Sequence, residues 1–223
     1  WDLEAAKKPK LMLANSKNIS RRITKYYHRD SELLYPFVDT KNFVINNDIK
    51  KKEFYFMSGR LVPYKHFEID VEAFNQLKDK VLLIAGSGNQ FKILSNKIKS
   101  DNIKMLGKVS FKELIKYYQQ ARGYIFTSLE DFGITPLEAM ACGTPVIAFG
   151  EGGALETVID EESGIFFKKQ NKNSLIEAIE RFEKIKFDQN KIRQTVIKKF
   201  SPKIFEKNVL KYVSREVSKI RRK

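Results

Sequence analysis

Short runs of apolar residues alternate along most of the chain with longer segments in which apolar positions recur at helical spacing. The apolar runs have the length of buried strands and end at glycine, proline or polar turns. They cover residues 11–14, 54–58, 81–85, 103–106, 124–127, 146–149 and 164–167. Helices are expected at 19–27, 67–76, 91–99, 111–120, 135–141, 154–158, 174–184 and 190–199. This alternation predicts an α/β fold with a Rossmann-like, doubly wound parallel sheet.

Polar residues mark the starts of two of these helices. Ser110 precedes the helix at 111–120, and Glu113 occupies the position that completes a capping box. Asn18 is expected to cap the helix at 19–27.

A last helix is predicted from Pro202 to Ile220. Apolar residues recur there at every fourth position and therefore share one helix face. They are Phe205, Val209, Val213 and Val217.

The segment from Glu130 to Thr157 contains two strand–turn–helix units in succession. Its turns are built around Gly133 and around Gly152-Gly153. Each turn opens onto a helix N-terminus, where unpaired amides and the helix dipole favour negative charge. We therefore expect a phosphate-bearing ligand at this edge of the sheet.

The same segment resembles glycosyltransferase family 4, a family of retaining enzymes with the GT-B fold. Its pattern, E-x-F-G-x-x-x-x-E-A-M-A-x-G-x-P-V-I-A followed by G-G-x-x-E, is complete from Glu130 to Glu156. Between Ala14 and Asp39 the chain also follows the family patterns A-N-S, R-I-x-K-Y-Y-x-R and Y-P-x-V-D. The resemblance covers nearly the whole chain but only about half of such an enzyme, its C-terminal, donor-binding domain.

The resemblance implies a division into three parts. Residues 1–45 correspond to the tail of the N-terminal domain and the interdomain crossover. Residues 46–199 form the donor-binding domain, and residues 200–223 form a C-terminal crossover helix with a basic tail.

The resemblance also implies a donor site with three catalytic candidates, Arg60, Lys65 and Glu130. Arg60 and Lys65 meet the charge that develops on the leaving diphosphate. Glu130 binds sugar hydroxyls and Glu138 binds the ribose hydroxyls. Glu130 is not expected to be a nucleophile, because retention in this family is ascribed to a same-face displacement. The other donor-binding candidates are Gly59, Gly107, Lys108, Val109, Phe132, Gly133, Ile134 and Thr135.

A further glycine turn, Gly86-Ser87-Gly88, is open to two interpretations. It is either a phosphate-binding loop or a plain tight turn. Phe91 stands where G-x-G-x-x-G would place its third glycine, which disfavours a dinucleotide site.

Within the family, Trp1-Asp2, Ala14-Asn15-Ser16 and Tyr35-Pro36 look most like mannosyltransferases of polysaccharide and lipopolysaccharide assembly. The expected substrates are GDP-mannose and a glycan or lipid-linked acceptor. The acceptor site would belong to the missing N-terminal domain, so this chain alone is expected to bind donor without transferring sugar. No Cys/His set or Asp-x-Asp pair suggests a metal, and no cofactor is expected.

The chain has 42 basic and 27 acidic residues among 223, a formal charge of +15. The excess reflects either solvated helix faces or attraction to anionic partners, such as a phosphate-bearing ligand or a membrane surface. The closing basic residues from Lys219 to Lys223 suit a membrane surface. Nucleic acid is not expected, because no aromatic–basic repeat accompanies the dispersed charges.

The single cysteine, Cys142, excludes an internal disulfide and is expected to be a packing residue.

The expected location is the cytoplasm, with peripheral contact at the inner membrane face. Because the sequence begins without Met, we expect a fragment of a longer protein. Two alternatives remain, an inactive nucleotide-sugar-binding module and a basic protein that binds anionic surfaces.

Overall fold

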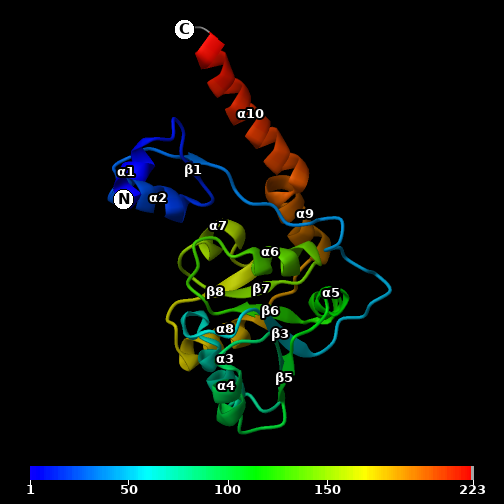
Figure 1. Cartoon of the computed structure of the whole chain (residues 1–223). Helices are drawn as coiled ribbons and strands as arrows, with labels where there is room; N and C mark the ends of the chain where they lie inside the picture. Colours follow the sequence, from blue (N-terminus) through cyan, green and yellow to red (C-terminus); the bar gives the residue numbers. More distant parts are fainter. Residues whose placement is uncertain (222–223) are drawn as a thin grey trace.

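The computed structural model describes residues 1–221 and is built around a six-stranded, all-parallel sheet (Figure 1). The strand order is β5-β4-β3-β6-β7-β8. The strands are β3 Phe54–Ser58, β4 Val81–Ala85, β5 Ile103–Gly107, β6 Gly123–Phe126, β7 Val146–Phe149 and β8 Gly164–Phe167. The predicted α/β fold is confirmed.

Helices cover both faces of this sheet. α3, α4 and α8 lie together on one face, while α5, α6 and α9 lie on the other (Figure 1). The bounds of these six helices are α3 Phe67–Phe74, α4 Phe91–Lys97, α5 Phe111–Gln120, α6 Ile134–Ala141, α8 Lys172–Phe182 and α9 Gln189–Phe200. The short helix α7, Ala154–Thr157, follows β7. Because both faces are covered, the central strands β6 and β7 are buried at every position, as their continuous apolar runs require.

The chain reverses its direction of travel across the sheet between β3 and β6. It moves outward from β3 to β4 and β5, returns to β6 beside β3, and then continues to β7 and β8 on the other side. The crossovers that leave β3 and β6 therefore diverge, which opens a crevice at the carboxyl ends of these two strands.

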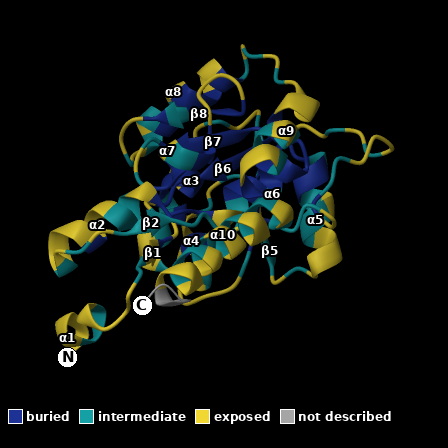
Figure 2. Cartoon of the chain, turned by 90° about the horizontal axis from the view of Figure 1, so that it is seen from above, coloured by how far each residue is buried: buried dark blue, intermediate teal, exposed yellow. Residues whose placement is uncertain are grey.

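The N-terminal part forms a separate small unit. It comprises α1 Asp2–Lys7, α2 Lys17–Tyr27 and a two-stranded parallel sheet of β1 Leu13–Ala14 and β2 Glu32–Leu33. Figure 2 shows that most of its surface is exposed or half-buried. The predicted strand at 11–14 is thus shorter than expected and lies outside the main sheet.

Predicted helix starts are partly confirmed. The Ser110–Glu113 capping box is present. The assignment of Asn18 as a cap was wrong, because Ser16 caps α2 by accepting from the Ile19 amide at 3.0 Å. The helix expected at 174–184 begins two residues earlier, because the Asn171 side chain accepts from the amide of Ser174.

The last helix, α10 Pro202–Arg221, runs away from the main sheet past the N-terminal unit (Figure 1). Tyr212 donates to the carbonyl of Leu33 at 2.7 Å, which ties the helix to β2. Leu210, Val213 and Val217 remain exposed on it. Residues 222–223 of the expected basic tail lie outside the described part of the chain.

Among the described residues, no helix combines the length and apolar character needed to cross a bilayer.

Cys142 is 1% exposed, and burial raises the pKa of its thiol to about 12. The thiol is therefore protonated at neutral pH, as expected of a packing residue.

Candidate functional site

Two cavities adjoin at the carboxyl ends of β3 and β6, where the crossovers diverge. The larger has a volume of about 980 Å³ and the smaller about 490 Å³. Thr135, in the first turn of α6, lines both. The start of α6 therefore separates two compartments of one crevice.

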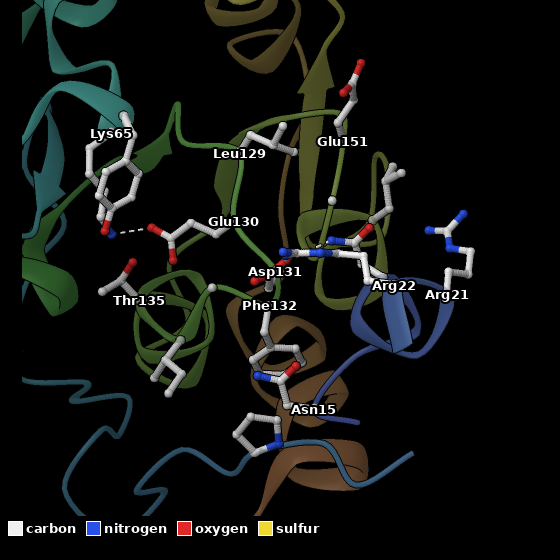
Figure 3. Close-up of a pocket in the computed structure, with 17 residues that line it drawn as sticks. Asn15, Arg21, Arg22, Lys65, Leu129, Glu130, Asp131, Phe132, Thr135 and Glu151 are labelled. Carbon is white, nitrogen blue, oxygen red and sulfur yellow. Dashed lines mark hydrogen bonds and ion pairs between the residues drawn. The ribbon is translucent and has the colours of Figure 1, made fainter. Parts of the chain in front are cut away.

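The larger cavity contains an ion pair between Lys65 and Glu130 (Figure 3). Lys65 ends the short 3₁₀ turn η1 Pro63–Lys65 after β3, and Glu130 lies in the loop between β6 and α6. Their side chains are only 16% and 24% exposed, so the pair is shielded from water more than a surface ion pair is. The cavity thus holds a cation and a carboxylate side by side.

The smaller cavity is lined by Glu138 on α6 and by Arg60 and Lys108, which follow the ends of β3 and β5. Tyr118 donates a hydrogen bond to Glu138 Oε2 at 2.9 Å, and Tyr118 lies 2.9 Å from the hydroxyl of Ser58. Burial raises the pKa of the Glu138 carboxyl, and the bond from Tyr118 opposes that rise. Glu138 is therefore a half-buried carboxylate with one oxygen fixed by a tyrosine.

The first turn of α6 faces both compartments with unpaired amides. The helix begins at Ile134 after Gly133, whose φ of 83° marks the left-handed region, and no side chain caps it. A Cβ on Gly133 would lie 2.9 Å from the ring of Phe126. The turn therefore needs glycine, and it presents the helix N-terminus to the crevice as the sequence predicted.

The second glycine turn, which follows β7, supports the first loop. The amide of Gly153 donates to the carbonyl of Glu130 at 2.8 Å. A Cβ on Gly153 would lie only 2.2 Å from the Cα of Phe132. Close backbone packing therefore requires this glycine and holds the Glu130 loop in place.

The Gly86-Ser87-Gly88 turn also has a packing role. A Cβ on Gly86 would lie 1.9 Å from the carbonyl oxygen of Gly59, because the ends of β3 and β4 approach closely there. Gly86 and Ser87 nevertheless line the smaller cavity. A tight turn is required by packing whether or not the turn contacts a ligand.

The crevice brings together nearly all of the predicted site residues. Lys65, Glu130, Phe132, Gly133, Ile134 and Thr135 line the larger cavity, and Gly59, Arg60, Lys108, Val109, Thr135 and Glu138 line the smaller. Arg60 and Lys65, expected to act together, lie in different compartments. Gly107 lies on neither wall.

Sequence reasoning missed the contribution of α2 to the larger cavity. Arg22 donates to Asp131 Oδ1 at 2.8 Å (Figure 3). The side chain of Asn18 donates to the same oxygen at 3.1 Å. Arg21 lines the same cavity. No local pattern relates these residues to a loop more than 100 positions away.

No group of three or more His, Cys, Asp or Glu side chains within residues 1–221 is arranged to hold a metal ion. The positive groups that line the crevice are the side chains of Arg21, Arg22, Arg60, Lys65 and Lys108, together with the α6 amides.

Comparisons with known proteins point to one family. The model of the family described as glycosyl transferases group 1 matches residues 38–199. The chain is 30% identical over 214 residues to the O-antigen chain mannosyltransferase RfbU of Salmonella typhimurium, covering 86% of this chain and 60% of that protein. The chain thus spans little more than half of this relative's length.

Solved structures agree on the fold. A sucrose-phosphate synthase from Thermosynechococcus elongatus superimposes with a TM-score of 0.84 at 22% identity, over 97% of this chain and 61% of that one. Anabaena HepE, in complex with UDP and glucose, gives 0.81 at 20% identity, over 95% of this chain and 65% of that one. The chain belongs to glycosyltransferase family 4, and its six-stranded sheet is that of the C-terminal domain of the GT-B fold.

Proposed function

We propose that this chain binds a nucleoside diphosphate sugar and is the donor-binding half of a retaining glycosyltransferase. The carrying observation is the divided crevice, in which Glu138 and Arg60 line one compartment and Lys65 and Glu130 line the other. We assign the nucleoside to the smaller compartment and the diphosphate and sugar to the larger. Within the larger compartment, the diphosphate then lies beside the start of α6, where the two compartments adjoin.

Glu138 is proposed to bind the ribose. Tyr118 occupies its Oε2 and orients the carboxylate, which leaves Oε1 for ribose hydroxyl donors. A hydroxyl donated to a half-buried carboxylate stabilises the charged form that burial disfavours. This contact favours a nucleoside over a simple phosphate.

Lys65, Arg60 and the α6 amides are proposed to stabilise the leaving diphosphate. Charge develops on this group as the glycosidic bond breaks, and fixed cations in a shielded crevice lower the energy of that state. Glu130 is proposed to accept sugar hydroxyls while it remains paired with Lys65. The positive charge for the reaction then comes from the protein, so the proposed mechanism uses no metal or other cofactor.

The donor is proposed to be GDP-mannose, supported by the likeness to a mannosyltransferase of O-antigen synthesis. The structural likeness to HepE, which was solved in complex with UDP and glucose, supports instead a donor with uridine as its nucleoside. The nucleobase is therefore the part of the proposal to test first. The acceptor is proposed to be a glycan or lipid-linked glycan, bound by sequence outside this chain at the cytoplasmic membrane face.

The division into residues 1–45, 46–199 and 200–223 also stays a proposal. Under it, the N-terminal unit and α10 belong to the junction with the acceptor-binding half. Sugar transfer is then measurable only with the full-length protein. Donor binding without transfer in that protein would identify an inactive nucleotide-sugar-binding module.

Calorimetric titration of this chain with GDP, UDP and ADP tests the donor site. We expect saturable binding that favours one base and weakens about 10- to 100-fold in Glu138→Ala, because charged hydrogen bonds contribute about 1.5–3 kcal/mol. Glu180→Ala, an exposed glutamate on α8, is the matched control and should bind as the wild type does. Weak, salt-sensitive binding of all three, unchanged in Glu138→Ala, would instead indicate a basic surface that attracts anions.

A further inference from the structure

Among residues 1–219, Asp70 is the one residue of the types Asp, Glu, Lys, Arg and His that is buried in the core. It lies in α3 and is 0% exposed. Its Oδ2 accepts a hydrogen bond from the hydroxyl of Thr127 at 2.5 Å. Its Oδ1 has no hydrogen-bond partner among the described residues. An aspartate in such a place costs stability that an apolar residue would not, so its presence needs a reason.

The partner of Asp70 begins the loop that carries Glu130. Thr127 follows β6 directly, is 1% exposed, and lies three residues before Glu130. Its carbonyl accepts from the side chain of Gln170 at 2.9 Å. The hydroxyl and the carbonyl of Thr127 are thus both held by side chains from elsewhere in the chain, so Thr127 is a fixed point at the base of the loop.

Asp70 also lies five residues after Lys65, on the segment that supplies this lysine to the larger cavity. The two segments, residues 65–70 and 127–130, are joined at three places. Thr127 donates to Asp70, the Ser128 hydroxyl donates to the Lys65 carbonyl at 3.2 Å, and Lys65 pairs with Glu130. The Asp70–Thr127 bond is the buried end of this series, and the ion pair is the end at the cavity.

We propose that Asp70 is a positioning residue that fixes the Glu130 loop through Thr127 and so sets the Lys65–Glu130 pair at the cavity. The effect on the loop follows from the contacts alone. The effect on ligand binding rests on the proposed donor site. The alternative is a core carboxyl that the fold merely tolerates.

Three variants separate these possibilities. Asp70→Ala removes the acceptor, Asp70→Asn keeps a neutral acceptor for the Thr127 hydroxyl, and Thr127→Val removes the donor with little change in shape. A positioning residue predicts that Asp70→Ala and Thr127→Val loosen the loop while Asp70→Asn does not. It also predicts that the double variant is no looser than either single variant, because one bond is lost in each case.

Amide hydrogen exchange of Gly153, whose amide donates to the carbonyl of Glu130 at 2.8 Å, tests the effect on the loop without any ligand. We expect about fivefold faster exchange in Asp70→Ala and Thr127→Val, with wild-type exchange in Asp70→Asn, since one hydrogen bond contributes about 1 kcal/mol. Urea unfolding of the same variants shows whether global stability changed. Unchanged exchange in Asp70→Ala, or equal acceleration in Asp70→Asn, would overturn the proposal.

Calorimetry then tests the link to the site, using whichever of GDP, UDP and ADP binds the wild type most tightly. We expect Asp70→Ala to weaken this diphosphate about three- to tenfold and the matching monophosphate less, because Lys65 lies in the compartment assigned to the diphosphate and sugar. Equal affinity in Asp70→Ala, despite a looser loop, would refute the link. If the wild type binds no nucleotide, the donor-site proposal fails, while hydrogen exchange still decides the role of Asp70 in the loop.

Discussion

Replacing Glu156 by alanine should loosen α2 without unfolding the main sheet. The carboxylate of Glu156 accepts hydrogen bonds from the amides of Lys17 and Asn18 at 2.9 and 3.1 Å and from the Tyr35 hydroxyl at 2.8 Å. The first two are amides at the start of α2, and Ser16 takes the next available one, that of Ile19. A glutamate of α7 therefore completes the N-terminal cap of a helix about 140 residues earlier in the chain.

The size of the effect follows from these bonds. A helix cap contributes about 1–2 kcal/mol, and a hydrogen bond from a half-buried hydroxyl about 1 kcal/mol. The freed amides can bind water, so the loss is nearer about 2–3 kcal/mol than the full sum of three charged bonds. α2 has 11 residues, and a helix of that length depends on such tertiary contacts.

Hydrogen exchange of the α2 amides measures this loss directly. About 2–3 kcal/mol corresponds to about 30- to 150-fold faster exchange in Glu156→Ala, and Glu156→Gln should fall between this variant and the wild type. Glu162→Ala, an exposed glutamate close by in the chain, is the control and should leave α2 unchanged. If α2 exchanges at the wild-type rate in Glu156→Ala, the contacts of Asp131 suffice to hold it and the reasoning is refuted.

Two more predictions concern stability. Arg193→Ala should lower the unfolding free energy by about 3 kcal/mol in urea titrations, because Arg193 donates to three backbone carbonyls. Those carbonyls belong to Thr40, Phe43 and Ala141. Lys191→Ala, the control on the same helix, should change the unfolding free energy by less than about 0.5 kcal/mol. Burial raises the pKa of Asp70 to about 8, with a smaller contribution from the negative charge of Glu68 on the same helix, which is itself paired with His66. The unfolded chain loses the Asp70 proton near pH 4, and the folded chain loses it near pH 8. The unfolding free energy of the wild type, relative to that of Asp70→Asn, should therefore fall as pH rises from 4 to 8. The expected fall is on the order of 5 kcal/mol, and the difference should level off above pH 8. A difference that stays constant with pH would show that Asp70 does not titrate in this way.

The sheet was predictable from the sequence because its signals are local. Each strand is a continuous apolar run that ends at a turn residue, and helical spacing fills the intervals. The predicted strands at 54–58, 81–85, 146–149 and 164–167 match the observed bounds. The N-terminal unit was predicted less well, since β1 and β2 are two residues each and pair only with one another.

The site was predictable as a set of residues but not as an arrangement. The family resemblance identified Arg60 and Lys65 as a pair of bases in one turn, yet their side chains enter different compartments. Tyr118, which orients Glu138, lies on a helix whose sequence pattern indicated only an amphipathic face. Such contacts depend on how helices pack across the sheet, and no spacing along one segment encodes them.

The three glutamates of the family pattern show why spacing alone cannot assign a role. Glu130 pairs with a lysine at a cavity, Glu138 accepts from a buried tyrosine, and Glu156 caps a helix of the N-terminal unit. Their partners lie 65, 20 and 139 positions away, and each partner sets a different chemistry for the same side chain. The glycines of the pattern add a fourth role, since Gly153 packs against the loop that carries Glu130. The pattern therefore specifies a scaffold as much as a binding site, and substitutions at Glu156 and Gly153 should act on the position of the site before they act on its chemistry.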